Sequence, residues 1–207
     1  MNNKFPKNSN IPSVVTYRRN KAVQQKYHFD DKNIIKYTYS FDGKIISIEV
    51  YSNGVLASKQ YNESNGSRLT YYNNGQISKE YNFKNSELVK SSSYYSNGLV
   101  NLIQYYKNNK LHNDNGPALI EHNYDGSINA EIYYKNGKLH SDNRPAITYY
   151  YENGNIESKH WYKNGKRHRD NGPAIFRYNI DGDVVLEKYC LNGKEVDELA
   201  ILVSENY

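Results

Sequence analysis

Apolar and polar residues alternate along short segments of this chain, and the segments are separated by Asn-Gly or Asp-Gly pairs. Residues 45–51 (IISIEVY) and 129–134 (NAEIYY) are examples. Alternation with a period of two is typical of strands that have one face for burial and one for water. Asn-Gly and Asp-Gly supply the two successive positive-φ residues of a type I′ hairpin turn. The sequence therefore predicts a run of antiparallel β-hairpins.

An internal repeat dominates the second half of the chain. Three 28-residue repeats run without a gap from Tyr105 to Lys188: YYKNNKLHNDNGPALIEHNYDGSINAEI, YYKNGKLHSDNRPAITYYYENGNIESKH and WYKNGKRHRDNGPAIFRYNIDGDVVLEK. A truncated fourth repeat, YCLNGKEVDELAILVSENY, follows. Each full repeat has an early and a late turn, with His-x-Asp-Asn-x-Pro-Ala between them. Repeat arrays of this kind are stabilised mainly by contacts between neighbouring units.

Residues 34–104 carry a degenerate version of the same unit, in which all turn sites are closely spaced. In the second half a short spacing, as from Asn97 to Asn108, alternates with a longer one, as from Asn108 to Asp125. The longer segment is therefore an insertion. The thirteen turn sites predict about 14 strands. The expected fold class is all-β: an elongated array of antiparallel β-hairpins. The expected segments are 1–33, 34–104, 105–188 and 189–207.

The two ends of the chain depart from the repeat. Residues 1–33 lack turn periodicity and carry seven Lys or Arg residues against two Asp, which predicts a basic N-terminal arm or an irregular first hairpin. Residues 195–204 place apolar side chains at near-helical spacing. They predict a short amphipathic helix that caps the last open strand edge.

The composition fits a thin core. Val, Ile, Leu and Phe make up only 21% of the chain, but there are 23 tyrosines to add bulk, and the 30 asparagines lie largely in turns. The net charge of +5 comes from 27 basic residues interspersed with 22 acidic ones, without the block of like charge that marks nucleic-acid binding. The single cysteine, Cys190, excludes an internal disulfide and a Cys-based zinc site.

Nothing in the sequence predicts membrane insertion or export. No stretch approaches 18 consecutive apolar residues, and Met1 to Ser13 has no apolar signal region. The expected location is therefore a reducing cytoplasm, which would be the host cytoplasm for a phage or viral protein.

The units with Tyr-Tyr-x-Asn-Gly-Lys-Leu-His and Asp-Asn-Gly-Pro-Ala resemble MORN-like repeats, in particular the YYxNGxxHRxDGPA variant of phage, giant-virus and bacterial proteins. They are also similar to YwqK-type antitoxin repeats. The resemblance covers Tyr105 to Lys194 well and the segment 41–104 loosely, and it leaves out the N-terminal segment 1–33. It implies strand-turn-strand units that serve as a scaffold for contact with a protein or a lipid surface.

The resemblance and the lack of a catalytic constellation together predict a non-enzymatic protein with no cofactor. We expect it to bind a protein partner along its sheet, such as a toxin or a host-defence enzyme, in the manner of an antitoxin or phage counter-defence inhibitor. A DarT-type DNA ADP-ribosyltransferase is one specific target, as for anti-DarT factors of T-even phages. The alternatives are binding to a single-stranded nucleic acid, binding to an anionic membrane surface, and a structural role as a virion accessory protein.

Two features carry possible chemistry. His112, His140 and His168 recur every 28 residues, each two positions before an Asp. They could form a ladder for metal binding or general-base work, or they could hydrogen-bond the connection between strands. Regular repetition favours the second interpretation, because catalysis needs one asymmetric site, so no metal site is predicted. Cys190 takes the second aromatic position of the repeat and is interpreted as a buried strand residue.

Adjacent strand residues face opposite ways, so one aromatic residue of each Tyr-Tyr pair is expected in the core and the other on the surface. Trp161 takes the first position in the third repeat, in the neighbourhood richest in Arg and aromatic residues. Aromatic and Arg side chains are enriched at protein interfaces. The predicted partner-binding patch consists of Arg144, His160, Trp161, Arg167 and Arg169, with Tyr17, Arg18 and Arg19 of the basic arm as a second candidate.

Overall fold

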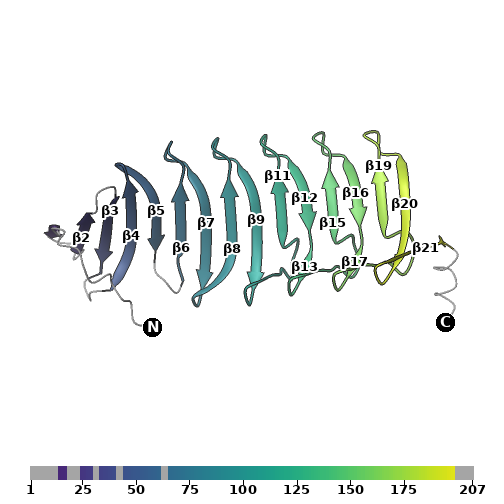
Figure 1. The fold of residues 1–207 in the computed structure, drawn as a ribbon, viewed down its shortest axis with the longest axis horizontal. Coiled ribbons are helices and arrows are strands. Elements are labelled where there is room, and N and C mark those ends of the chain that lie inside the picture. Colours follow the sequence, from purple (N-terminus) through teal and green to yellow (C-terminus); the bar gives the residue numbers. More distant parts are fainter. Residues whose placement is uncertain (1–13, 18–23, 30–32, 41–43, 62–64, 199–207) are drawn as a thin grey trace. The chain divides into compact units, whose positions relative to one another are not determined.

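The computed structural model describes residues 14–17, 24–29, 33–40, 44–61 and 65–198. These residues form an all-β structure in which every pair of neighbouring strands is antiparallel, as predicted (Figure 1). The chain divides into two compact units, unit 1 (residues 1–86) and unit 2 (residues 87–207). The segment boundaries read from the repeat stay a prediction.

Unit 1 is a meander in which each strand pairs with the next. Antiparallel pairing is continuous from the β1–β2 pair to the β6–β7 pair. Within the segment 1–33, β1 and β2 are thus an antiparallel pair. The strands are β1 (Val14–Tyr17), β2 (Gln24–Phe29), β3 (Asn33–Tyr39), β4 (Ile45–Ser52), β5 (Val55–Tyr61), β6 (Ser67–Tyr71) and β7 (Ile77–Lys84).

Unit 2 has one sheet of long strands in the order β8-β9-β11-β12-β15-β16-β19-β20. The long strands are β8 (Glu87–Tyr94), β9 (Val100–Lys107), β11 (Leu119–His122), β12 (Ile128–Ile132), β15 (Ile147–Tyr150), β16 (Ile156–His160), β19 (Ile175–Tyr178) and β20 (Val184–Leu191).

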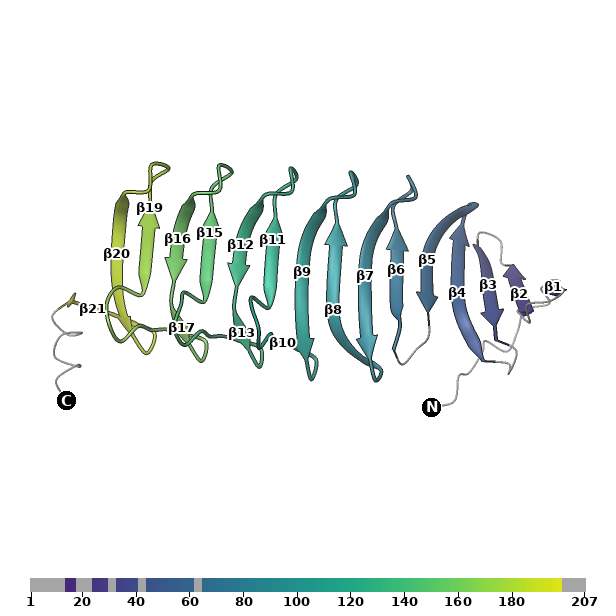
Figure 2. The same ribbon diagram turned by 180° about the vertical axis from the view of Figure 1, so that it is seen from behind.

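Short strands flank the early turns of unit 2, where the insertion of each repeat begins. They are β10 (Lys110–Leu111), β13 (Tyr134–Lys135), β14 (Lys138–Leu139), β17 (Tyr162–Lys163), β18 (Lys166–Arg167) and β21 (Lys194–Val196). β13 pairs with β14 and β17 with β18, while β10 and β21 pair with the ends of β9 and β20. Figure 2 shows these hairpins gathered at one end of the long strands. The prediction of about 14 strands omitted them: the described residues contain 21 strands, of which these six are short.

The hairpin turns are of two kinds, although the sequence predicted one. The early turns have two successive positive-φ residues, as in Asn136 (53°) and Gly137 (80°), and Asn108-Asn109 works in the same way at 52° and 57°. These are the predicted I′-like turns. At the late turns only the glycine has positive φ, as at Gly126 (91°), Gly154 (84°) and Gly182 (95°), so the I′ prediction is wrong there.

The late turns instead combine a tight turn with a bulge. The Gly126 amide donates to the Asn123 carbonyl (3.0 Å), and the Ser127 amide donates to the Asp125 side chain (2.9 Å). The strand register shifts just before this loop, between Glu121 and His122. A three-residue loop with a left-handed glycine at a bulge matches the twist of a hairpin as well as an I′ turn does. Asp-Gly and Asn-Gly therefore fix a hairpin without fixing its turn type.

The apolar core of unit 2 lies between the sheet and its short hairpins. Leu119, Ala130, Ile132 and Ile147 are buried together. The residues that pack against them include Leu111, Tyr134, Leu139 and Tyr162, three of which belong to β13, β14 and β17 and one to β10. No large side chain in the described part of the chain is fully buried, so the core is thin.

Unit 1 reverses the expected faces of residues 45–51. Ser47 and Glu49 are the buried members, each 7% exposed, whereas Ile46 is 42% exposed. The Glu49 carboxylate is paired with Lys59 (2.8 Å) and Lys36 (3.1 Å) and accepts a hydrogen bond from the Tyr51 hydroxyl (3.0 Å). This polar cluster satisfies the buried charge, so the alternation was correct but the buried face was the polar one.

At the C-terminal end, the strand pattern continues further than predicted. Glu195 and Val196 belong to β21 and pair with Cys190 and Tyr189 of β20, so the predicted helix cannot begin at residue 195. The hairpin turn at Asn192-Gly193 keeps these residues extended beside β20. Glu198, within the predicted helix, is helical, and the remaining residues of the prediction, 199–204, lie outside the described residues.

Candidate functional site

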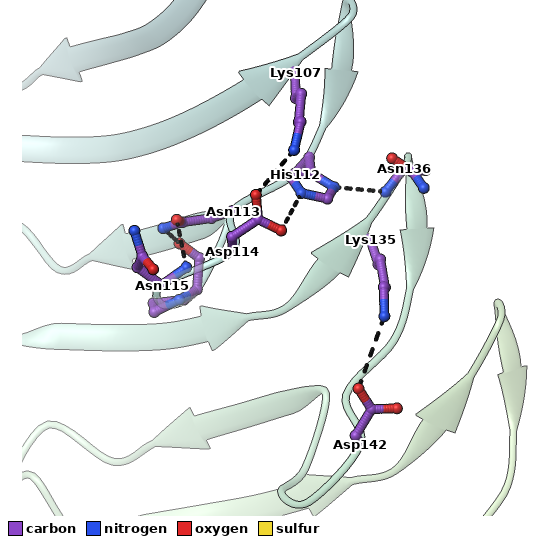
Figure 3. A network of polar contacts seen from close by, with 9 residues as sticks. Lys107, His112, Asn113, Asp114, Asn115, Lys135, Asn136 and Asp142 are labelled. Carbon is purple, nitrogen blue, oxygen red and sulfur yellow. Dashed lines mark hydrogen bonds and ion pairs between the residues drawn. The ribbon is translucent and has the colours of Figure 1, made fainter.

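The three repeated histidines each connect one repeat to the next. In the first repeat, His112 Nε2 lies 2.8 Å from Asp114 Oδ1, while its Nδ1 accepts a hydrogen bond from the backbone amide of Asn136 (3.0 Å), as Figure 3 shows. The acceptor role of Nδ1 places the proton of the neutral ring on Nε2, which donates to the carboxylate. His140 and His168 make the equivalent bonds to Asn164 and Asn192 (both 3.1 Å).

Lysines and glycines complete this connection. Lys107 is paired with Asp114 (3.0 Å), and Lys135 with Asp142 (3.8 Å). The Gly137 amide donates to the Leu111 carbonyl (2.8 Å), and a Cβ built on Gly137 would lie 3.5 Å from the Lys110 side chain. Both nitrogens of each histidine are thus engaged, Nε2 with the aspartate of its own repeat and Nδ1 with the turn of the next repeat. Within the described ranges, no group of three or more His, Cys, Asp or Glu side chains could hold a metal ion.

The first aromatic residue of each repeat lies in a row of residues that are neighbours across adjacent strands. Large and small side chains alternate along this row. Backbone bonds from Tyr105 to Ala118, from Tyr133 to Ala146 and from Trp161 to Ala174 extend the strand register by one residue. The three alanines are completely buried. Each alanine therefore lies between two aromatic residues, on the sheet face opposite the core.

The aromatic face, as we call it, is the part of this sheet face formed by Tyr133, Trp161, Phe176 and Tyr178 with their cations Arg144, Arg169 and Lys159. Trp161 meets Phe176 edge to face, with 5.6 Å between ring centroids, and Phe176 stacks on Tyr178 at 6.1 Å. The Arg169 guanidinium lies 4.2 Å from the Trp161 ring centroid, and Lys159 Nζ lies 5.4 Å from that of Tyr178. These are cation–π distances.

Arg169 is held firmly in this cluster. One of its Nη atoms donates to the Pro173 carbonyl (3.1 Å), and its guanidinium also lies 5.8 Å from the Phe176 ring centroid. Burial lowers the pKa of Arg169 from its usual value. The cluster therefore presents a fixed, partly desolvated positive charge among aromatic rings.

The structure brings together only part of the predicted patch. Trp161 and Arg169 are in contact, and Arg144 makes the same kind of contact with Tyr133 in the preceding repeat. His160 instead lies in the row of Ile147 and Ile175, on the core side of the sheet. It meets Tyr149 edge to face, and burial, followed by the charges of Arg167 and Arg177, lowers its pKa.

Arg167 also lies on the core side. Its Nε donates to the Tyr162 hydroxyl (3.0 Å), and Tyr162 packs against the core of unit 2. Strand alternation separates His160 from Trp161 although they are neighbours in sequence. Of the second candidate, Tyr17 ends β1 opposite Gln24, while Arg18 and Arg19 lie outside the described residues.

The sequence patch missed Phe176, Tyr178 and Lys159. The signal was present in the third repeat, where FRYN follows Pro-Ala-Ile and places Phe176 and Tyr178 at alternate positions. Only the register of β16 on β19, with Lys159 opposite Phe176, shows that they share a face with Trp161. Long-range register of this kind cannot be read from one strand.

The second aromatic position lies on the core side, as one member of each pair was expected to. Tyr134 and Tyr162 pack against the core, and Cys190, which takes this position in the fourth repeat, is 3% exposed in β20. Burial raises the pKa of the Cys190 thiol. The interpretation of Cys190 as a buried strand residue is confirmed.

Comparisons with known proteins give no family for this chain. No family model matches, and no curated protein matches. Two solved structures of TarM are similar to part of it. One, a structure of TarM, has 9% identity and a TM-score of 0.22; the other, of an S. aureus TarM mutant with fondaparinux, alpha-GlcNAc-glycerol and UDP, has 8% identity and a TM-score of 0.23. Each covers 45% of this chain and 19% of the TarM chain, and at these TM-scores the similarity supports no conclusion.

Helices capable of crossing a membrane are absent from the part of the chain that the structure describes.

Proposed function

We propose that this protein is a non-enzymatic binding protein whose aromatic face contacts a partner protein. The observation that carries the proposal is the Trp161 cluster, in which Arg169 and Phe176 contact the single tryptophan of the chain and Tyr178 stacks on Phe176. Trp, Tyr and Arg are the residues that contribute most to protein interfaces, and rigid side chains lose little entropy on binding.

Residues that recur in every repeat and residues that occur in one repeat have different roles, and this supports a scaffold rather than an enzyme. His, Asp and Lys recur in every repeat and pair with one another within it, and each histidine also accepts a hydrogen bond from a backbone amide of the next repeat. Arg144, Trp161 and Arg169 differ from their counterparts in the other repeats and lie on the sheet face opposite the core. Periodic residues build the scaffold, and non-periodic residues give one region of it a particular surface.

The partner class comes from the resemblance to MORN-like and antitoxin repeats. We propose a toxin or a host-defence enzyme, with a DarT-type DNA ADP-ribosyltransferase as the specific candidate, which the protein would neutralise as a phage counter-defence or antitoxin-like factor. No residue described above discriminates among such enzymes, so the choice depends on direct binding.

A photo-crosslinking experiment tests the proposal. A benzophenone amino acid is placed at Phe176 on the aromatic face or, as the matched control, at Arg167 on the core side. We expect one defined protein to cross-link at position 176 in extract of the source cell and not at position 167. The same protein should bind purified wild-type chain, and Trp161→Ala should weaken that binding about 30-fold, as expected for an interface anchor.

Nucleic-acid binding gives different results in the same experiment. Adducts with oligonucleotide instead of protein, together with an affinity that falls steeply with salt, would replace the proposal. Equal protein adducts at both positions would also contradict it. Inhibition of a purified DarT-type enzyme, retained in Arg167→Ala and lost in Trp161→Ala, would identify the candidate target.

A further inference from the structure

Arg144 is the residue at which the second repeat departs from the other two. The first and third repeats have Gly116 and Gly172 at the same position before Pro-Ala. Arg144 and Gly116 both lack a positive φ, whereas Gly172 has φ 123°. The backbone at Arg144 therefore does not require glycine, and an arginine is accommodated there without strain.

The contacts of Arg144 leave its charge uncompensated. The guanidinium lies 5.4 Å from the Tyr133 ring centroid, and one Nη atom donates to the Tyr133 hydroxyl at 3.3 Å. Among the described residues, no carboxylate lies within ion-pair distance of it. The nearby Lys135 is paired with Asp142, and Lys107 with Asp114. Arg144 is thus an exposed guanidinium held over a ring, with donors still available.

A cleft of about 360 Å³ opens beside Arg144, between the His-x-Asp-Asn loops of the first and second repeats. Tyr133 and Arg144 line it together with Asn113, Asp114, Lys135 and Asp142. The corresponding cleft between the second and third repeats measures only about 120 Å³, and Arg169 lines it. Arg169 stands where the second repeat has Ser141, so the larger cleft has no such arginine filling it.

A carboxylate suits this cleft better than a chain of phosphates does. Guanidinium binds carboxylate through two parallel hydrogen bonds, and a planar ring beside it restricts the approach to one orientation. Asp114 and Asp142 lie on the same rim and are 62% and 69% exposed. Both are paired with lysines, so Arg144 supplies one unpaired guanidinium to the cleft, which matches a single acidic side chain rather than successive phosphates of a nucleic acid.

We propose that the Arg144 cleft receives an acidic side chain, Asp or Glu, of the partner protein. This inference rests on the proposed function, because it specifies which chemistry the aromatic face recognises. The Trp161 cluster supplies apolar contact area, while Arg144 selects a carboxylate.

Selection from a random peptide library displayed on phage tests this inference without a known partner. The wild-type chain is expected to enrich peptides with Asp or Glu at one position, and replacing that residue by Asn or Gln should weaken binding about tenfold or more. Arg144→Gly should weaken binding similarly. It introduces the residue that the other repeats carry at this position, so the fold is retained. Arg144→Lys should bind more tightly than Arg144→Gly but more weakly than wild type, because lysine keeps the positive charge but cannot form two parallel hydrogen bonds to a carboxylate.

A transplanted arginine gives the complementary test. Gly116→Arg places a guanidinium near Tyr105, at a position where a Cβ would lie 3.6 Å from the Asn113 side chain, an ordinary contact. In the Arg144→Gly background, this change should restore binding of the acidic peptides. Gly172→Arg is the negative control, since its φ of 123° strains any side chain.

The outcomes separate this inference from the proposed function. Enriched peptides that need Trp161 but carry no acidic residue, or that bind Arg144→Gly equally well, would overturn the carboxylate and leave protein binding intact. No enrichment at all would count against both proposals. Binding of single-stranded oligonucleotides that depends on Arg144 would overturn both in favour of a nucleic acid.

Discussion

Units 1 and 2 use the same antiparallel strands but bury different kinds of residues. Every buried apolar side chain in the described residues belongs to unit 2, where short hairpins pack over one face of the sheet. In unit 1 the buried side chains are Ser47 and Glu49, held in a cluster of charges and hydroxyls. The short hairpins at the early turns explain the difference, because their side chains give unit 2 a second layer.

This comparison shows where a repeat array can carry a binding surface. The short hairpins of unit 2 cover one face of its sheet. The opposite face carries the aromatic side chains and the arginines that contact them. The histidine connections keep that face in register from repeat to repeat. Unit 1 lacks the His-x-Asp-Asn-x-Pro-Ala segment in its sequence, and there the Asn85 turn amide donates to the Asn65 side chain instead (2.8 Å).

The largest expected effect is on the charge cluster of unit 1. Burial of the Glu49 carboxylate raises its pKa, but hydrogen bonds from Lys59, Lys36 and Tyr51 more than offset this and lower the pKa to about 2. A depressed folded-state pKa gives stability that is complete above the unfolded pKa of about 4.3 and is lost as the pH falls toward 2. We expect unit 1 to lose about 3 kcal/mol of unfolding free energy over that range.

Hydrogen exchange followed by mass spectrometry at pH 5 and at pH 2.5, corrected for intrinsic rates, checks this prediction. Amides of β3, β4 and β5 should lose protection on acidification. Glu49→Gln should show the same loss already at pH 5 and little further change on acidification. A pH response of β4 that persists in Glu49→Gln would mean that another carboxyl group is responsible.

The second effect concerns the alternating row of unit 2. Ala146 is completely buried between Tyr133 and Trp161, so Ala146→Leu should overpack the row and lower the unfolding free energy by about 2 kcal/mol. The matched change in unit 1, Ala57→Leu, is at a half-buried strand position and should cost less. Urea denaturation followed by the fluorescence of Trp161, the only tryptophan, measures the first change, and hydrogen exchange measures both.

A smaller effect is expected for the histidine connections. His140→Ala removes the acceptor of the Asn164 amide and one partner of Asp142, and should cost about 1 kcal/mol. Amide exchange of Asn164 should accelerate, while that of turns in unit 1 stays unchanged. Asp142→Ala retains the backbone bond and should affect Asn164 less. Equal acceleration in both variants would show that the carboxylate, rather than Nδ1, fixes the turn.

The smallest effect is at the one early turn of the repeats without glycine. Asn109 has φ 57°, which glycine adopts more easily. Asn109→Gly should therefore stabilise unit 2 by about 0.5 kcal/mol, seen as a higher urea midpoint of Trp161 fluorescence. Gly165→Asn, the reverse change in the third repeat, should lower the midpoint by a similar amount.

Local features of this fold could be predicted from the sequence, whereas features that depend on register could not. Asn-Gly pairs indicated the hairpins, and the repeat indicated the buried position of Cys190. The bulged turn at Asp125-Gly126 was missed because the same dipeptide serves two turn types. The buried Glu49 was missed because its two lysines come from neighbouring strands. Likewise, Trp161 and Arg169 could be chosen from composition, but separating them from His160 required the faces of the sheet.

The histidine connection runs in one direction, since each ring reaches the turn that follows and never the one before. His168 extends this to Asn192, so the turn of the incomplete fourth repeat donates its amide to a ring of the third. A 28-residue segment copied within the array would carry its own histidine and its own turn, and would restore every junction it interrupted. Duplication or loss of a whole repeat can therefore change the number of repeats in a single genetic step, while the contacts at each junction between repeats stay the same.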